Sequence, residues 1–386
     1  MPTETAVATR SWPPRRELMP ATATSHRPKG RFWFSTTFVA CLFVAIPATG
    51  LEYPDTIRFQ RRGPSEGLSQ ATVTSVVQDH DGFIWIGTQE GLNRFDGYDF
   101  TVYRHNPQDP KSLSHDWVRA LLVDSSGTLW VGTEDGGLNR LNDSGRDFEH
   151  FVNEPTDPTS LSDDRIRAII EDIDGELWIG TDGGGLNRFD PETATFRAYT
   201  HNPADPASLS SDRVSSLELG PDDVLWIGTD GGGLNRMAPT TEGVFQHYRH
   251  DPEDSASLGD DRIRSLLTDQ DGTVWLGTHE SGLEHLDPKS GIFRRHRFDP
   301  ERPSSLSSDH RVRDIARDSR GRLWIATDAG LNVKLPGDDQ FRAFRTDPAN
   351  SMSLSDDRAT TIYQDRGGVL WVGTYNGINI WNAVTD

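Results

Sequence analysis

An aspartate followed by an arginine opens the first predicted strand of four repeats, at positions separated by 48, 49 and 96 residues. The pairs are Asp164-Arg165, Asp212-Arg213, Asp261-Arg262 and Asp357-Arg358. An arginine fork and a carboxylate can together bind the hydroxyl or acidic groups of a sugar. The alternative is that each aspartate caps a turn and pairs with arginine locally or in a neighbouring repeat. The regular spacing places the pairs on one face of a repeated fold in either case.

Positions that depart from this pattern are stronger candidates for a site, because functional residues are where a repeat tends to break its own rules. Trp117 follows Asp116 at a position where the other copies have arginine. A tryptophan on a rim offers a surface on which a sugar ring stacks, and packing against the neighbouring loop is the alternative. In the last copy, Tyr375 and Asn376 occupy a turn that is one residue shorter than in copies two to five.

Histidine also breaks the pattern, and histidine is the most common general acid or base near neutral pH. The run His279-Glu280-Ser281-Gly282-Leu283-Glu284-His285 replaces an Asp-Gly-Gly-Gly-Leu-Asn-Arg series, and His310 is inserted before Arg311. A lyase or hydrolase would need such histidines gathered in one site. A zinc site is disfavoured, because His279 and His285 lie on either side of a turn.

These positions make one set of candidate ligand-binding residues: Asp116, Trp117, Arg119, Asp164, Arg165, Arg167, Asp182, Asp212, Arg213, Asp230, Asp261, Arg262, His279, Glu280, His310, Arg311, Asp357, Arg358 and Tyr375. No catalytic residue, metal ligand or cofactor is expected. Acidic pairs such as Asp172 and Asp174 lack the further oxygens of a calcium loop. The triple glycines after Asp182 and Asp230 lack the lysine and the helix of a phosphate loop. Hairpin turns are the favoured interpretation of both.

Seven tryptophans give the framework that would position these residues. They recur at intervals of 45 to 49 residues, each followed by an apolar residue, then glycine or alanine, then threonine: Trp85, Trp130, Trp178, Trp226, Trp275, Trp324 and Trp371. A period in the forties, rich in tryptophan, glycine and β-forming residues, is typical of a β-propeller with one blade per repeat. The sequence therefore predicts an all-β, seven-bladed propeller with four-stranded blades, in which the tryptophans pack between blades.

The third copy shows the expected blade most clearly. Its strands are predicted at residues 165–170, 177–181, 186–189 and 196–199, from the centre outward. The run Asp-x-x-Gly-x-x-Trp before the second strand recurs in six copies and resembles the Asp-box of sialidase-type propellers. Aspartate and glycine there favour a hairpin turn.

The two ends of the chain complement each other. Residues 56–60 match an outermost strand that has no blade before it, whereas residues 377–381 match a third strand that has no outermost partner. We therefore expect the N-terminal strand to complete blade seven, which closes the ring and removes an exposed sheet edge.

The first fifty residues differ from the rest. Basic side chains precede an apolar run at residues 32–46, and small residues follow it up to Gly50, as in a secretory signal. The run is short for a membrane span, which needs about 20 residues, and an uncleaved inner-membrane anchor is the alternative. The expected organisation is a basic region with a signal segment at 1–50 and a single propeller at 51–386, periplasmic or secreted. The only cysteine, Cys41, lies in the signal segment, so the propeller has no disulfide.

Three motifs carry a resemblance to a known family: Leu161-Ser162-x-Asp164-Arg165-Ile166, Asp172-x-x-Gly175-x-Leu177-Trp178-Ile179-Gly180-Thr181 and Gly185-Leu186-Asn187-Arg188-Phe189-Asp190. They resemble the two-component regulator propeller repeat, and the resemblance covers residues 56–382. It implies a periplasmic sensor region like those of hybrid histidine kinases and diguanylate-cyclase receptors, many of which respond to oligosaccharides. It also implies a membrane-bound signalling partner, because the chain has no kinase, receiver or cyclase motif.

The sequence therefore predicts a ligand-binding propeller of a two-component-type signalling system, not an enzyme and without its own output domain. The expected ligand is a small molecule or an oligosaccharide. A net charge of −20 argues against a nucleic-acid partner. A protein-interaction propeller is the first alternative, and a propeller lyase or hydrolase using His279, His285 and His310 is the second.

Overall fold

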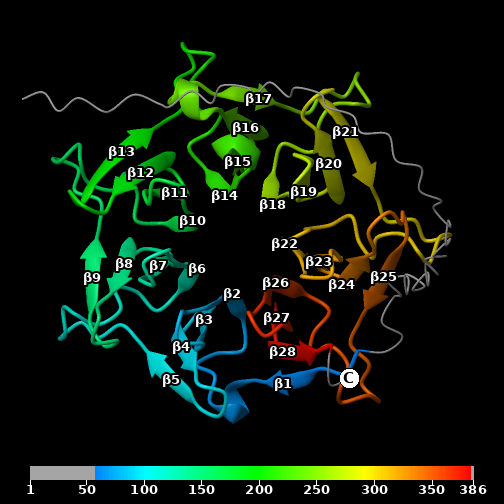
Figure 1. The fold of residues 1–386 in the computed structure, drawn as a ribbon, viewed down its shortest axis with the longest axis horizontal. Helices are drawn as coiled ribbons and strands as arrows, with labels where there is room; N and C mark the ends of the chain where they lie inside the picture. The colour runs from blue at the N-terminus through cyan, green and yellow to red at the C-terminus, as the bar shows by residue number, and fades with distance from the viewer. Residues whose placement is uncertain (1–56, 384–386) are drawn as a thin grey trace, which may run out of the picture. The chain divides into compact units, whose positions relative to one another are not determined.

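Residues 57–383 are described in the computed structural model, and they form seven four-stranded antiparallel sheets in a ring (Figure 1). The innermost strands are β2 (Val73–Gln78), β6 (Val118–Val123), β10 (Ile166–Glu171), β14 (Val214–Leu219), β18 (Ile263–Thr268), β22 (Asp314–Arg317) and β26 (Ala359–Gln364). The second strands are β3 (Ile84–Thr88), β7 (Leu129–Thr133), β11 (Leu177–Thr181), β15 (Leu225–Thr229), β19 (Val274–Thr278), β23 (Leu323–Thr327) and β27 (Val369–Thr374). The third strands are β4 (Gly91–Phe95), β8 (Leu138–Leu141), β12 (Leu186–Asp190), β16 (Leu234–Met237), β20 (Leu283–Asp287), β24 (Gly330–Lys334) and β28 (Gly377–Asn382). The outermost strands are β5 (Phe100–Tyr103), β9 (Phe148–Phe151), β13 (Thr195–Tyr199), β17 (Gln246–Tyr248), β21 (Ile292–His296), β25 (Phe341–Phe344) and β1 (Gln60–Arg62).

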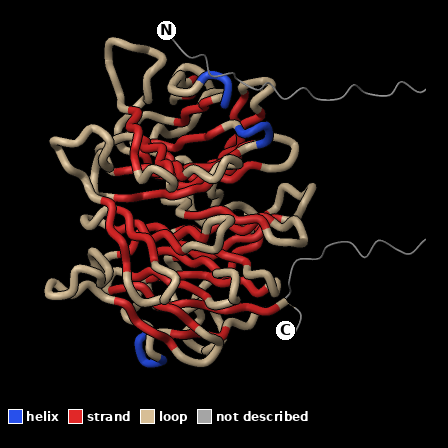
Figure 2. Tube along the Cα trace, turned by 60° about the vertical axis from the view of Figure 1, so that its left-hand side comes forward, coloured by secondary structure: helices blue, strands red, loops and turns tan. Residues whose placement is uncertain are grey.

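This arrangement confirms the predicted seven-bladed propeller. Neighbouring innermost strands contact one another all the way round, and β26 contacts β2 to complete the circle. Figure 1 shows these strands around a central opening. Figure 2 shows that the rest of the described chain is loop, apart from three short 3-10 turns: η1 (Pro64–Glu66), η2 (Pro221–Asp223) and η3 (Pro239–Thr241).

Strand β1 closes the ring as the outermost strand of blade seven. It pairs antiparallel with β28, with Gln60 opposite Ile380. The prediction that an N-terminal strand completes this blade is confirmed, but the strand begins at Gln60, the last residue of the predicted range 56–60. Ile57 and Phe59 lie before the strand and are buried in the core, with 7% and 3% of their surface exposed. Residue 56 lies outside the described residues.

The repeated tryptophans lie in the core between blades, as predicted, and their hairpin turns hold them there. In blade two, Asp124 Oδ2 accepts the indole Nε1–H of Trp130 at 2.8 Å, and its Oδ1 accepts the backbone N–H of Thr128 at 2.8 Å. The same aspartate–indole bond recurs in six blades at 2.7–2.9 Å. Blade four has Asp222 and Asp223 in a left-handed turn instead, with φ of 60° and 57°.

The signal segment predicted at residues 1–50, with its apolar run at 32–46, lies outside the described residues and stays a prediction. Of the range 51–386 predicted as one propeller, the described part is the closed ring. No helix within residues 57–383 is long and apolar enough to cross a membrane.

Candidate ligand site at the mouth of the central channel

A β-bulge near the start of the innermost strand gives most blades one residue that is free of the strand ladder. In blade three, Ile166 pairs with Thr181 and Ala168 pairs with the adjacent Gly180, so Arg167 is an extra residue between them. Bulges re-aim side chains in this way. The same irregularity occurs in six blades, at Thr74, Arg119, Arg167, Ser215, Arg264 and Thr360.

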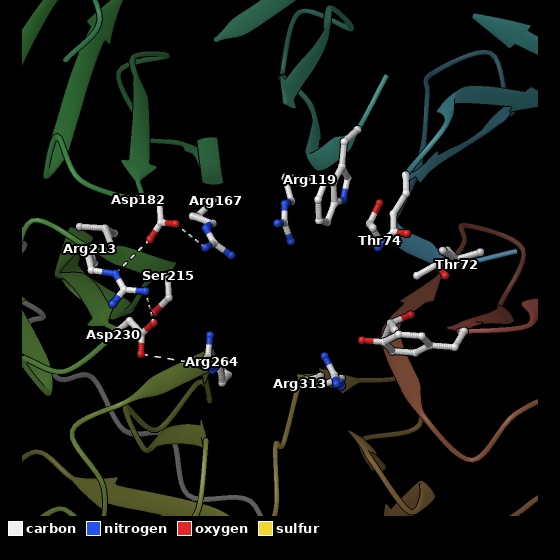
Figure 3. A pocket seen from close by; sticks show the side chains of 16 residues that line it. Thr72, Thr74, Arg119, Arg167, Asp182, Arg213, Ser215, Asp230, Arg264 and Arg313 are labelled. Carbon is white, nitrogen blue, oxygen red and sulfur yellow. Dashed lines mark hydrogen bonds and ion pairs between the residues drawn. The ribbon is translucent and has the colours of Figure 1, made fainter. Parts of the chain in front are cut away.

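These residues meet in a cavity of about 380 Å³, to which every blade contributes. The equivalent residue of blade six is Arg313, whose backbone N–H donates to Ala326 just before β22 begins. Because all seven blades line it, the cavity lies on the ring axis, at one mouth of the central channel. Figure 3 shows four of the lining arginines pointing toward the same opening: Arg119, Arg167, Arg264 and Arg313. Its volume is within the range of small-molecule sites, about 300–1,000 Å³.

A carboxylate that follows the second strand of the same blade neutralises three of these four arginines. The pairs are Arg119 with Glu134, Arg167 with Asp182 at 2.5 Å, and Arg313 with Asp328 at 2.7 Å. Such pairs hold each guanidinium at a fixed place beside the opening.

Arg264 is less well compensated. Its ion pair with Asp230 spans 3.7 Å, and the guanidinium of Arg264 makes no hydrogen bond with the described residues. Burial lowers the pKa of Arg264, the charge of Asp230 opposes this, and the nearby charges of Arg167, Arg311 and Arg313 lower the pKa further. A half-buried guanidinium beside other cations creates a positive potential in the cavity.

Arg213 links the two carboxylates that line the cavity. Its Nε lies 3.2 Å from Asp182 Oδ1 and a terminal nitrogen lies 2.8 Å from Asp230 Oδ2 (Figure 3). Burial disfavours the ionised form of Asp182, but the hydrogen bonds and charges of Arg167 and Arg213 outweigh burial and hold the pKa of Asp182 below its usual value. Asp182 is therefore held in its ionised form, and both carboxylates are paired with arginine.

Two aromatic side chains complete the lining. The guanidinium of Arg119 lies 3.9 Å from the centre of the Trp117 ring, and that of Arg358 lies 4.2 Å from the centre of the Tyr375 ring. These are cation–π contacts. Because Arg119 covers one face of Trp117, a sugar ring can stack on this tryptophan only from the opposite face.

Three buried donors in the lining have no hydrogen-bond partner within the described chain. They are Trp117 Nε1, Arg167 Nε and Thr360 Oγ1. Indole and guanidinium nitrogens donate only, and a hydroxyl can donate. All three atoms are buried beneath the cavity surface, so they do not face a ligand in the opening.

Seven of the nineteen candidate residues predicted from sequence line this cavity: Trp117, Arg119, Arg167, Asp182, Arg213, Asp230 and Tyr375. Five predicted aspartates lie outside the lining. Each accepts the backbone N–H of the residue eleven positions earlier and so caps its own loop, as in the turn-capping alternative: Asp116, Asp164, Asp212, Asp261 and Asp357.

Three predicted arginines pair with an aspartate two residues earlier, not with the adjacent one. These pairs are Arg165 with Asp163 at 2.9 Å, Arg262 with Asp260 at 3.1 Å and Arg358 with Asp356 at 3.0 Å. Blade four has Ser211 at the aspartate position. Arg213 therefore lacks a local carboxylate and reaches across to Asp182 and Asp230.

His279 and Glu280 follow the second strand of blade five beside the cavity. Nε of Arg311 donates to His279 Nε2 at 3.3 Å, and Glu280 pairs with Arg262 at 2.9 Å. Burial lowers the pKa of His279, and the charges of Arg264, Arg262 and Arg311 lower it further. His279 is therefore neutral at neutral pH.

The histidines of the lyase interpretation do not gather in one place. His310 is exposed and is held through its backbone N–H, which donates to Ser308 at 3.0 Å. His285 lies on β20, the third strand of blade five, outside the cavity lining. Its Nδ1 lies 3.1 Å from Nε2 of His296. Among the described residues, no three His, Cys, Asp or Glu side chains come together as a candidate metal site.

Sequence reasoning missed Arg264 and Arg313, together with the smaller lining residues Thr72, Thr74, Gln89, Ser215 and Thr360. A signal for them was present. Arg264 and Arg313 occupy the repeat position of Arg119 and Arg167, two residues after Arg262 and Arg311. An alignment of the seven copies at that position would have found the ring of bulge residues.

Comparison with known proteins identifies the repeat. A family model described as two-component regulator propeller matches residues 67–90, 112–135, 160–183, 257–280, 305–329 and 353–376. The chain belongs to the two-component regulator propeller family. Each matched repeat of the family runs from the loop before the innermost strand to the end of the second strand, so it contains the bulge residue. None of the six matches falls on blade four, whose hairpin departs from the repeat.

Solved structures of signalling proteins share this propeller. The extracellular domain of a putative hybrid two-component system from B. thetaiotaomicron is 27% identical with a TM-score of 0.72, over 85% of this chain and 42% of that one. A second such domain from the same organism is 22% identical with a TM-score of 0.67, over 84% of this chain and 40% of that one. The two-component regulator propeller described here thus spans less than half of each.

Two further similarities are more limited. Histidine kinase P4 of Formosa agariphila is 38% identical over 81 residues, which are 21% of this chain and 6% of that kinase. A catalytically inactive virginiamycin B lyase from Staphylococcus aureus, solved with quinupristin, is 14% identical with a TM-score of 0.62, over 85% of this chain and 99% of the lyase. At that identity the lyase shares the fold, and the similarity carries no conclusion about catalysis.

Proposed function

We propose that this two-component regulator propeller is the sensory, ligand-binding part of a two-component-type signalling system and acts in the periplasm or outside the cell. The similarity to the extracellular domain of a hybrid two-component system, over 85% of the chain, supports this role. The observation that carries it is the cavity of about 380 Å³ on the ring axis, lined by all seven blades. A membrane-bound signalling protein is the partner we expect.

The ligand that we propose is an oligosaccharide or another small polar molecule. The lining combines arginines, hydroxyl groups and the half-buried Trp117. Arginine forks and hydroxyls bind sugar oxygens, and an indole face binds the apolar face of a sugar ring.

A thermal-shift screen of the purified chain against neutral and acidic oligosaccharides tests this proposal. A ligand that binds the native state raises the unfolding midpoint, and the rise grows with the logarithm of the ligand concentration above the dissociation constant. We expect Arg167→Ala and Trp117→Ala to weaken binding by about tenfold or more, because the first removes a guanidinium and the second an aromatic ring from the cavity lining.

Arg146→Ala is the matched control, since Arg146 is exposed in the hairpin between β8 and β9. Equal affinity in the cavity variants and in this control would place the site elsewhere. A midpoint that no sugar moves, together with a stable protein partner that co-purifies, would replace the sensor proposal by a protein-interaction role.

A further inference from the structure

The charge of the cavity is opposite to that of the chain. The chain has a net charge of −20, yet five arginines and two aspartates line the cavity, and Glu134 and Asp328 just outside the lining each pair with one further arginine of the lining. Both aspartates are already bound by arginine: Asp182 by Arg167 and Arg213, and Asp230 by Arg213. A cation would therefore meet no free carboxylate in the lining, and the uncompensated charge there is positive.

Arg264 provides the clearest sign of missing negative charge. Its partner Asp230 is 3.7 Å away and is shared with Arg213, which lies closer at 2.8 Å. An arginine that is largely enclosed needs a carboxylate or another anion within hydrogen-bond distance to offset its desolvation. The described chain does not supply one to Arg264, although its guanidinium points into the opening (Figure 3).

The hydrogen-bonding groups that the arginines bring to the lining are all donors. A guanidinium has five N–H donors, no acceptor and a fixed positive charge. A carboxylate, sulfate or phosphate group brings acceptors and negative charge, whereas a neutral sugar hydroxyl brings no charge. The guanidinium of Arg264, which makes only the 3.7 Å ion pair among the described residues, therefore matches an anionic group.

We propose that the cavity recognises an anionic group, a carboxylate or an oxyanion of sulfur or phosphorus, held between Arg167, Arg264 and Arg313. This inference rests on the proposed ligand-binding function and names the chemical class of its ligand. Arg119 and the free face of Trp117 then contact the part of the ligand that adjoins the anion. For a sugar ligand, this assignment selects acidic sugars over their neutral counterparts.

Isothermal titration calorimetry of the purified chain with two matched probes tests the assignment. The probes are α-1,4-linked trigalacturonate and α-1,4-linked galactotriose, which differ in the carboxylates; sodium sulfate and sodium phosphate form separate arms. We expect trigalacturonate to bind at least about tenfold more tightly than galactotriose, with an affinity that falls as sodium chloride is raised. Tighter binding of sulfate or phosphate than of trigalacturonate would assign the site to an inorganic oxyanion.

Variants separate the anion assignment from the sensor proposal. Arg264→Met should lower trigalacturonate affinity by about tenfold or more, and Arg264→Lys should restore part of it, because lysine keeps the charge without the fork. Arg146→Ala should change nothing. Galactotriose binding as tight as trigalacturonate, insensitive to salt and to Arg264→Met, would overturn the anion assignment and leave the sensor proposal standing. Absence of binding by every probe would overturn both.

His279 offers a readout that does not depend on the Arg264 variants folding well. The charges of Arg264, Arg262 and Arg311 contribute to its lowered pKa. An anion bound beside Arg264 offsets those charges, so the pKa of His279 should rise when trigalacturonate is added to the unmodified chain. An NMR titration of the imidazole measures this. An unchanged pKa at saturating trigalacturonate would contradict the assignment.

Discussion

Arg165 and Arg167 stand two positions apart, yet only Arg167 lines the cavity. Arg165 begins the blade and is held by Asp163, whereas Arg167 is the bulge residue and is directed to the ring axis. Sequence reasoning found the Asp-Arg pairs because adjacent charges are conspicuous. Within a single repeat it could not tell which arginine reaches the centre, because the bulge sets that direction. Only an alignment of the seven copies marks the bulge position.

A buried acid near the cavity gives a prediction about pH. Glu218 on β14 accepts the backbone N–H of Thr268 at 2.9 Å, and burial, with the charge of Asp314 adding to it, raises the pKa of Glu218 to about 7. Part of the Glu218 surface is accessible to solvent, but protein encloses the carboxyl. Because the folded state holds this proton more tightly than the unfolded state, its contribution to stability is present below about pH 4.5 and is lost as the pH rises through about 7.

We therefore expect Glu218→Gln to be more stable than the unmodified chain at about pH 8, by about 1–3 kcal/mol, and nearly equal to it at about pH 5. Glutamine keeps an oxygen to accept the Thr268 N–H. Urea unfolding at the two pH values measures the difference. A constant offset between the two proteins at both pH values would show that Glu218 does not titrate in this range.

At the scale of the strand and hairpin, the sequence was a reliable guide. For blade three, it predicted strands at 165–170, 177–181, 186–189 and 196–199, and the structure has Ile166–Glu171, Leu177–Thr181, Leu186–Asp190 and Thr195–Tyr199. The hairpin signals are local, since aspartate, glycine and tryptophan lie within seven residues. The bounds of strand β1, by contrast, differ from the predicted range 56–60. Its pairing with β28 joins the two ends of the propeller and is fixed by packing rather than by local preference.

The hairpin aspartate should contribute strongly to stability. Asp124 is 8% exposed and Trp130 is 1% exposed, so Asp124→Ala leaves the indole N–H and the Thr128 amide without their partner. We expect a loss of about 2–4 kcal/mol in the free energy of unfolding, measured by urea unfolding. Asp143 is exposed in the turn between β8 and β9. Asp143→Ala should change the free energy of unfolding by no more than about 0.5 kcal/mol. Equal effects of the two variants would contradict the structural role of the hairpin aspartate.

For the ring as a whole, closure depends on a short N-terminal segment. Strand β1 covers the edge of β28, and Ile57 and Phe59 fill the core beside it. A propeller without this segment exposes a strand edge, which is a template for association. The seven-blade count and the place of closure were predictable from sequence because the repeats are regular. The cavity on the axis was harder to predict from the sequence, because it forms only where all seven blades meet.

Comparison of a chain that begins at residue 57 with one that begins at residue 63 tests ring closure. The shorter chain should unfold at a lower temperature and associate with increasing concentration, because it loses β1 and two buried side chains. Calorimetry and light scattering measure the two effects. Closely similar melting and a monomeric shorter chain would show that closure by β1 is dispensable.

Amide hydrogen exchange of the purified chain, with and without saturating trigalacturonate, tests most directly whether ligand binds at the mouth of the channel. The structure predicts slower exchange in peptides that contain the bulge residues Arg119, Arg167 and Arg264 at the starts of β6, β10 and β18, with the outermost strands unchanged. Protection confined to the outermost strands or to the β1–β28 seam, with these peptides unaffected, would contradict binding at the mouth of the channel.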